Sequence, residues 1–311
     1  MARKENKKKK KGFMYSLYRD RHFYIMSLPA IVWFIIFAYI PMAGIYIAFT
    51  RFLPGMTIFG APWTGLDNFR FLLNDPFFWR AFRNTAIIST LRIVIGILLS
   101  VGLAILFNEL RSKKFRFMSQ TFSYLPFFLS WVIVSIFFTM MLRQGNIADE
   151  LARTFDFLPA ITMTNPDQFR AILIVSVMWR EVGYSSIIFT AALMNVSPVL
   201  VESLEMDGGN RWHKIWYISL PTIRFSIVII LILWIGAFVT MGFEQVINMY
   251  NPAVFSTGDI VDTYVFRIAF SAVANYGAGT AAGLMRGILA AAMMFTANYV
   301  SKRLTDSSIL F

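Results

Sequence analysis

Five ionisable side chains lie within long apolar segments of the sequence: Arg92, Arg180, Glu181, Glu244 and Arg286. A charge at membrane depth is costly, so such residues by default face a protein interior or a water-filled path. One interpretation is a polar lining that binds the hydroxyl or carboxylate groups of a passing solute. The other is pairing between helices, for instance of Glu244 with Arg286, and for any single residue the sequence favours pairing.

The sequence offers little for chemistry that makes or breaks bonds. It has no cysteine and only two histidines, His22 and His213, which excludes disulfides, thiol catalysis and a histidine metal cluster. It also has no Gly-x-x-x-x-Gly-Lys-[Ser/Thr] loop, so it lacks the backbone cradle for nucleotide phosphates. We therefore predict no catalytic residue, no metal site and no cofactor in this chain.

The composition is that of an integral membrane protein. Hydrophobic residues make up 57% and charged residues 15% of the 311 positions, against about 45–50% apolar residues in soluble domains. The net charge of +12 is concentrated in an N-terminal basic stretch, with Arg3, Lys4, Lys7 to Lys11, Arg19 and Arg21. Its place directly before an apolar segment predicts a cytoplasmic anchor beside anionic lipid, and no binding of nucleic acid.

Six segments are long and apolar enough to cross a membrane, which takes about 20 residues. They span residues 23–49, 83–107, 117–142, 170–195, 222–247 and 279–301. The first exceeds the apolar core of a signal peptide, about 7–15 residues, so we expect it to remain as a helix. The expected domains are a basic tail (1–21), a six-helix domain (22–303, core 82–301) and a C-terminal tail (304–311).

The orientation follows from the distribution of Lys and Arg. Most of them lie on the side of the N-terminal tail, including Arg111, Lys113, Lys114 and Arg116 after the second segment. Positively charged loops stay in the cytoplasm. Both termini are therefore expected to be cytoplasmic, together with the loop between the fourth and fifth segments.

That loop carries the most distinctive pattern in the chain. Ser197-Pro198 predicts a helix start, with a hydroxyl cap and a proline at the first position, and the helix should run from Val199 to Met206. Asp207-Gly208-Gly209 should end it, because glycine readily accepts a positive φ. Asn210 then caps a second helix, Arg211 to Ser219, ahead of Leu220-Pro221. The pattern fits either a foot that docks in a groove of a soluble partner or an ordinary capped loop.

The loop resembles the EAA loop of the permease subunits of binding-protein-dependent ABC importers, of the carbohydrate-uptake, maltose- and oligosaccharide-permease type. The matching positions are Glu202, Asp207, Gly208, Ile218, Leu220 and Pro221. Ser203, Leu204 and Gly209 stand where that pattern has alanine, and Ile215 where phenylalanine is usual. Further stretches resemble the same permeases, namely Gly65 to Trp79, Asn84-Thr85, Trp179 to Tyr184, Ala191 to Leu193, Tyr264 to Arg267 and Tyr276-Gly277. The resemblance covers roughly residues 29–300.

The resemblance implies an all-α polytopic membrane protein in the bacterial cytoplasmic membrane, with six transmembrane helices, both termini inside, and a cytoplasmic coupling helix between helices 4 and 5. Its partners would be a second, homologous permease in a heterodimer, a dimer of ATPase subunits that bind ATP and Mg²⁺, an extracytoplasmic solute-binding protein and membrane lipid. The coupling residues would be Glu202, Ser203, Leu204, Asp207, Gly208 and Gly209.

The implied cargo is an oligosaccharide or polysaccharide. Arg180 and Tyr184 are one helical turn apart and could clasp a sugar through a donor and an aromatic ring, while Glu181 points elsewhere and should pair. Trp131, in the middle of the third segment, is a further candidate for the path, with Arg92, Glu244 and Arg286. Three arginines against two glutamates favour an acidic, uronate-containing saccharide over a neutral one.

Two other classes of protein remain as alternatives. A proton-coupled secondary transporter could relay protons through Glu181 or Glu244. A membrane-embedded glycan-processing enzyme would need clustered acids, and Asp259 with Asp262 is the nearest approach to such a set. We expect these two aspartates instead to cap a helix or to contact a binding protein.

Overall fold

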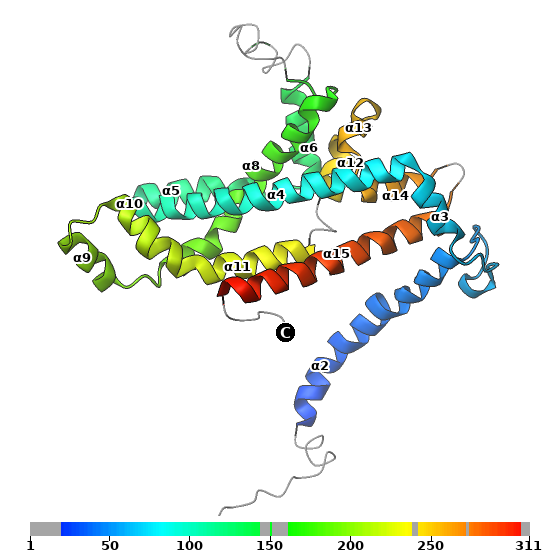
Figure 1. Cartoon of the computed structure of the whole chain (residues 1–311), viewed down its shortest axis with the longest axis horizontal. Coiled ribbons are helices and arrows are strands. Elements are labelled where there is room, and N and C mark those ends of the chain that lie inside the picture. Colours follow the sequence, from blue (N-terminus) through cyan, green and yellow to red (C-terminus); the bar gives the residue numbers. More distant parts are fainter. Residues whose placement is uncertain (1–19, 144–149, 151–160, 238–241, 272–273, 306–311) are drawn as a thin grey trace, which may run out of the picture.

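The computed structural model describes residues 20–143, 150, 161–237, 242–271 and 274–305. The basic residues before Asp20 and the last six positions lie outside this part of the chain. Within it the protein is all-α, and its only β pairing is an isolated bridge between Thr50 and Trp63 (Figure 1).

Four of the six predicted spans are confirmed as long helical segments. The first is helical from Arg21 to Phe49 through α2 (Arg21–Phe34), η1 (Ile35–Tyr39) and η2 (Ile40–Phe49). The others are α4 (Pro76–Glu109), α8 (Pro166–Leu193) and α15 (Tyr276–Thr305). With the segment Arg211–Ala237, five helical segments are long and apolar enough to cross a membrane, and a bent pair brings the number to six.

The third predicted span, 117–142, is not one straight helix. It consists of α5 (Lys113–Tyr124), the short turn η4 (Leu125–Phe128) and α6 (Trp131–Met141), and the chain bends there by 101°. Pro126 has no N–H to donate, and the Ser130 hydroxyl accepts from the backbone N–H of Ile133 at 3.4 Å, which starts a new helix. Hydropathy alone does not show such a break, because both arms are apolar.

The fifth predicted span, 222–247, is wrong at its end. α11 (Leu220–Ala237) is followed, beyond four residues outside the described part, by a separate helix, α12 (Phe243–Met249). Gly242 precedes α12 with φ +102°, a conformation that favours glycine. Glu244 therefore lies on α12 and not on the spanning helix α11.

The remaining elements are short. They are η3 (Ile58–Gly60), α3 (Asp67–Asn74), α9 (Pro198–Met206), α10 (Arg211–Lys214), η5 (Ile215–Ser219), η6 (Pro252–Val254), α13 (Phe255–Gly258) and α14 (Val261–Ala269).

The core forms around α4 and α8, which pack along each other, with α11 and α15 beside them (Figure 1). One apolar cluster joins α4 and α8 to α12 and the α12–α13 connection, through residues such as Ile88, Phe169 and Val246. A second joins them to α11, and a third joins η2, α3 and the start of α4 to α14 and α15. These clusters hold the polar groups of the bundle in fixed positions.

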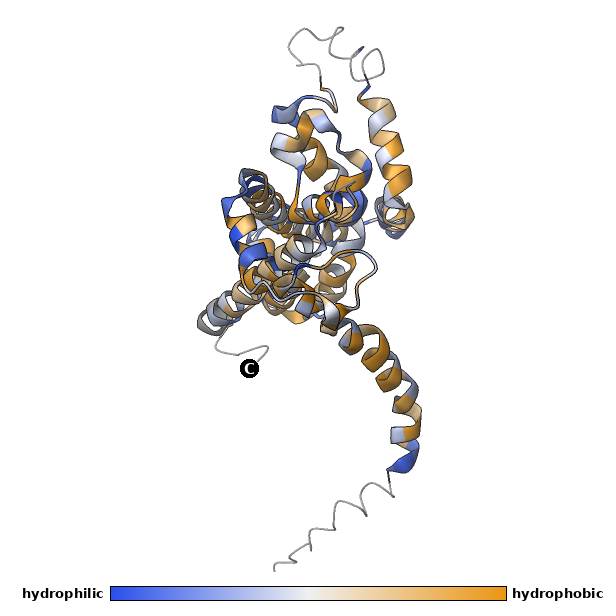
Figure 2. Ribbon diagram, turned by 90° about the vertical axis from the view of Figure 1, so that its right-hand side faces the viewer, coloured by the Kyte–Doolittle hydropathy of each residue, from blue (hydrophilic) through white to orange (hydrophobic). Residues whose placement is uncertain are grey.

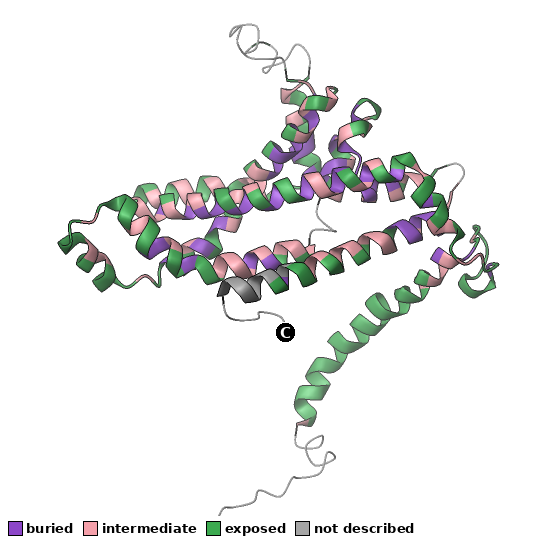
Figure 3. Cartoon of the chain, in the orientation of Figure 1, coloured by how far each residue is buried: buried purple, intermediate pink, exposed green. Residues whose placement is uncertain are grey.

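α2 differs from this core because none of its residues is buried. The helix projects from the bundle and is almost entirely hydrophobic on the outside (Figures 2 and 3). An apolar helix of this length is stable only when lipid or another chain covers it.

Gly183 of α8 lies directly against the backbone of α5. A Cβ atom at this position would lie 1.9 Å from the backbone carbonyl oxygen of Ser123, and small residues allow helices in membranes to approach so closely. We expect Gly183→Ala to destabilise the protein by about 1–3 kcal/mol, as overpacking does. The melting temperature of the purified protein in detergent measures this. Gly102→Ala is the matched control, because nothing lies within 4 Å of its Cβ, and an equal melting temperature for the two variants would contradict the prediction.

Candidate functional site

The loop between α8 and α11 forms an elbow, which we define as residues 197–214. α9 ends at Met206, and Gly208 has φ +78°. The N–H groups of Asp207, Gly208 and Gly209 donate to the last carbonyls of α9, the shortest bond being 2.8 Å from Gly209 to Leu204. The predicted helix and its glycine reversal are confirmed.

The second arm of the elbow is capped as predicted. The Asn210 side-chain oxygen accepts from the N–H groups of Trp212 and His213, each at 3.0 Å, and His213 Nδ1 accepts in return from the Asn210 N–H at 3.2 Å. At the first arm, Pro198 holds the predicted position, but the Ser197 hydroxyl forms no capping bond. α10 continues through the π-helical turn η5 into α11 without a break.

The first arm, α9, has no buried residue, and only Val201 and Leu204 are half-buried, on the side of the helix that faces the α4–α5 connection. Glu202, Ser203, Asp207 and Gly208 are exposed, and the apolar side chain of Met206 is 87% exposed. Figure 1 shows this helix at one end of the molecule, beyond the ends of α4 and α8. An elbow with polar and apolar groups displayed together is suited to a protein contact.

Leu204 leaves no room for a side chain at position 209. A Cβ atom on Gly209 would lie 2.4 Å from Cγ of Leu204. It would also lie 2.7 Å from the backbone carbonyl oxygen of Leu204. The turn therefore requires glycine at position 209.

A cleft of about 530 Å³ lies beside the elbow, against the α4–α5 connection. On its wall Lys214 Nζ forms an ion pair with Glu109 Oε1 at 2.6 Å. Arg116 donates to the carbonyls of Asn108 and Leu110, at 3.0 and 2.8 Å. The Lys214–Glu109 pair ties α10 to the end of α4, and Arg116 ties α5 to the same end. These contacts were not predicted from the sequence, which shows the charges but not their partners.

The second candidate site is a largely buried charge cluster between α4 and α8. Both carboxylate oxygens of Glu181 accept from Arg92 Nη2, at 2.7 and 2.8 Å, and Oε1 also pairs with Arg180 Nη1 at 3.2 Å. The side chains are between 11% and 23% exposed. The expectation that Glu181 pairs is confirmed, and two guanidinium groups share this one carboxylate.

Aromatic rings surround Arg180. Its guanidinium carbon lies 4.7 Å from the ring centre of Trp131 and 5.3 Å from that of Phe127. The ring of Tyr184 stacks on that of Phe127, with 3.8 Å between the ring centres. The structure thus brings Arg180, Tyr184 and Trp131 together as a group, although Arg180 already donates to Glu181 and to the Leu129 carbonyl. Phe127, in the Leu-Pro-Phe-Phe turn of η4, was not predicted.

The predicted pair of Glu244 and Arg286 is wrong. Arg286 pairs with Asp262 at the start of α14, and Glu244 is exposed on α12 and in no ion pair among the described residues. Neither residue belongs to the cluster around Glu181.

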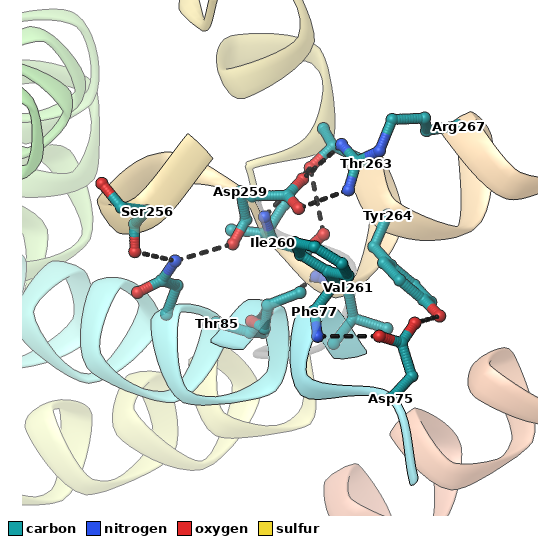
Figure 4. Close-up of polar contacts among 12 residues, drawn as sticks. Asp75, Phe77, Thr85, Ser256, Asp259, Ile260, Val261, Thr263, Tyr264 and Arg267 are labelled. Carbon is teal, nitrogen blue, oxygen red and sulfur yellow. Dashed lines mark hydrogen bonds and ion pairs between the residues drawn. The ribbon is translucent and has the colours of Figure 1, made fainter. Parts of the chain in front are cut away.

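A buried polar clamp joins α13 and α14 to the start of α4 (Figure 4). Asp259 is fully buried and accepts from Arg267 at 2.6 Å and from the Thr263 hydroxyl at 2.8 Å. Tyr264 donates to Asp75 at 2.5 Å, and burial together with this bond raises the pKa of Tyr264. Both aspartates predicted to cap or to contact a binding protein, Asp259 and Asp262, instead hold ion pairs inside the fold.

The fold and its sites define an all-α, multi-pass membrane protein whose buried polar groups position its helices. No model of a known protein family matches the chain. It is 35% identical over 304 residues to the polygalacturonan/rhamnogalacturonan transport system permease protein YteP of Bacillus subtilis, covering 97% of this chain and 94% of that one. A chain in the crystal structure of a bacterial ABC transporter involved in the import of the acidic polysaccharide alginate matches with a TM-score of 0.86 and 35% identity, over 94% of this chain and 99% of that chain.

A second structure of the bacterial alginate transporter, in complex with an alginate pentasaccharide-bound periplasmic protein, matches with the same TM-score and 34% identity, over 96% of this chain and 99% of that one. The chain belongs to the permease subunits of binding-protein-dependent carbohydrate ABC importers. ATP hydrolysis in such importers resides in separate subunits, so this chain is a permease and not an enzyme.

Proposed function

We propose that this permease imports acidic oligosaccharides or polysaccharides with α9 as its coupling helix. The observation that carries the coupling role is the exposed, capped elbow with its left-handed Gly208. The comparisons support the substrate class. The relative YteP is named for polygalacturonan and rhamnogalacturonan, and both similar structures are of a transporter for alginate.

The proposed topology has six spans with both termini in the cytoplasm, and domains at 1–21, 22–303 and 304–311. The bent pair α5–η4–α6 then counts as the third span. The Lys and Arg residues near the α4–α5 connection and in α10 support a cytoplasmic position for the elbow.

The elbow would transmit force by rigid-body motion. α10, η5 and α11 form one continuous helical segment, and Lys214 ties this segment to Glu109 at the end of α4. A dimer of ATPase subunits that closes on ATP and Mg²⁺ would move α9 and, through these links, tilt α4 and α11. The residues that meet the ATPase would be Glu202, Ser203, Leu204, Asp207, Gly208 and Gly209.

A second, homologous permease and membrane lipid would cover the apolar outside of the bundle. α2 has no buried residue, which supports a partner or lipid on that helix. An extracytoplasmic binding protein would deliver the saccharide at the opposite end from α9.

The buried cluster carries more positive than negative charge, because Arg92 and Arg180 share Glu181. This excess supports an acidic substrate near Arg180, Tyr184 and Trp131. Engagement of Glu181 by two arginines also disfavours the proton-relay alternative, since both of its carboxylate oxygens already accept hydrogen bonds from guanidinium groups.

Vesicles reconstituted with the complete importer test the proposal. Uptake of a galacturonate oligosaccharide should require ATP on the side of the membrane that carries the ATPase subunits. Collapse of the proton gradient should leave this uptake intact. A neutral oligosaccharide of equal length should be transported more slowly. Uptake that stops with the proton gradient would contradict the ABC mechanism, and preference for the neutral sugar would contradict the substrate class.

A further inference from the structure

A second cleft, of about 520 Å³, lies among the first turns of α4, the first turn of α8 and the α13 segment. Glu109 at the far end of α4 contacts α10, and Leu193 at the far end of α8 leads into α9. The cleft is therefore at the end of the bundle opposite the elbow.

Among the described residues, three arginines line this cleft, but only one carboxylate does, that of Asp167. Arg170 is held in place, since its Nη2 donates to Asn84 Oδ1 at 2.7 Å and its Nε donates to the Thr257 carbonyl at 3.2 Å. Both partners are neutral, so no contact with a described residue compensates the charge of Arg170.

The other two arginines retain unused donors. Arg80 lies over the ring of Phe77, at 5.0 Å, and its Nε is buried without a hydrogen-bond partner among the described residues. Arg83 is exposed. A buried donor without a partner is costly, so a group that accepts from it gains affinity.

The rigidity of the cleft comes from Asn84, which is buried. Its side-chain nitrogen donates to the carbonyls of Ser256 and Asp259, at 3.2 and 3.0 Å, the two residues labelled beside α4 in Figure 4. Asn84 thereby fixes the amide oxygen that orients Arg170. A preformed cluster of guanidinium groups requires little reorganisation when an anion binds.

Trp79 completes the wall of the cleft and is 46% exposed. An aromatic ring beside guanidinium groups matches a saccharide that carries carboxylates, because the ring stacks on the sugar while the planar guanidinium binds the carboxylate. The concave shape suits a chain of sugars better than the broad surface of a protein.

The cleft and the buried cluster lie on the same pair of helices. Nine residues separate Arg83 from Arg92 on α4 and ten separate Arg170 from Arg180 on α8, which is about 15 Å along each helix. The two cationic sites thus follow one another along the bundle axis.

We propose that the cleft lined by Trp79, Arg80, Arg83 and Arg170 is a subsite for the carboxylate of an acidic sugar, occupied before the chain reaches the cluster around Glu181. The inference rests on the proposed import of acidic saccharides. It assigns to this permease a share in selecting the substrate.

The test compares a galacturonate trisaccharide with its fully methyl-esterified, neutral form in vesicles that contain the complete importer. The double variant Arg80→Ala/Arg83→Ala should lower the uptake of the acid about tenfold, because charge-assisted hydrogen bonds to the carboxylate are lost. Uptake of the ester should stay within about twofold of the parent. Arg80→Lys/Arg83→Lys should recover part of the acid uptake, and Arg70→Ala, an exposed arginine of α3 outside the cleft, should leave both sugars unaffected.

Three results would overturn the subsite. One is equal acid uptake by the alanine variant and the parent. Another is an equal loss of uptake for the acid and the ester, together with weaker stimulation of the ATPase by the sugar-loaded binding protein. That result would make the cleft a docking surface for the binding protein. The third combines two observations. The double alanine variant does not reach the membrane, and the double lysine variant reaches it but takes up no more of the acid than the alanine variant does. If the parent importer takes up only the ester, the proposed substrate class itself fails, and the two failures are thus distinguishable.

Discussion

Gly208→Val is expected to abolish ATP-driven uptake while the protein still reaches the membrane. Gly208 has φ +78°, and a β-branched residue is strongly disfavoured in this left-handed region. The turn would therefore reorganise and move α9 away from its position relative to α10. Uptake by membrane vesicles, the amount of permease in the membrane and copurification of the ATPase subunits measure the effect.

The cause of this loss can be separated from simple crowding. No atom lies within 4 Å of a Cβ on Gly208, so only the backbone conformation opposes a side chain there. Gly208→Asn is the matched control, because asparagine tolerates the left-handed region better than other non-glycine residues, and it should retain most of the uptake. Normal uptake by Gly208→Val would show that the elbow does not transmit force.

The second large effect is expected at Glu181. Glu181→Gln leaves Arg92 and Arg180 without a carboxylate in the interior of the bundle. Removal of one partner of a buried ion pair costs about 3–5 kcal/mol. The melting temperature of the purified protein should fall by several degrees, and transport should fall with it.

A double variant tests whether the charge imbalance is the cause. Arg92→Met/Glu181→Leu removes one cation together with the carboxylate and should recover much of the lost stability, since apolar replacements of buried pairs are often well tolerated. Arg180 keeps its bond to the Leu129 carbonyl and its stacking on Trp131. If Glu181→Gln melts at the parent temperature, the cluster does not stabilise the bundle.

Local sequence signals predicted those parts of the molecule that short-range chemistry decides. Gly208 and the Asn210 cap were predicted because φ preferences and capping bonds involve neighbours in the chain. The long spans α4, α8 and α15 were predicted because their length and apolarity are properties of single segments. The resemblance to ABC permeases then gave the family.

The partners of charged residues could not be predicted in the same way. Arg286 was expected to meet Glu244 but pairs with Asp262, whereas Glu244 lies on the separate helix α12 and is exposed. Asp259 was expected to cap a helix or to contact a binding protein, yet the packing of α13 and α14 against α4 buries it beside Arg267. Such pairs depend on tertiary packing, which periodicity and charge counts do not contain.

The lack of any buried residue in α2 has a consequence for how errors in this protein become visible. Since this helix makes no core of its own with the remainder of the chain, a damaging change on its outer face would leave each copy correctly shaped. The defect would appear only during assembly. Copies of this chain would not be retained in a complete transporter and would be removed by proteolysis.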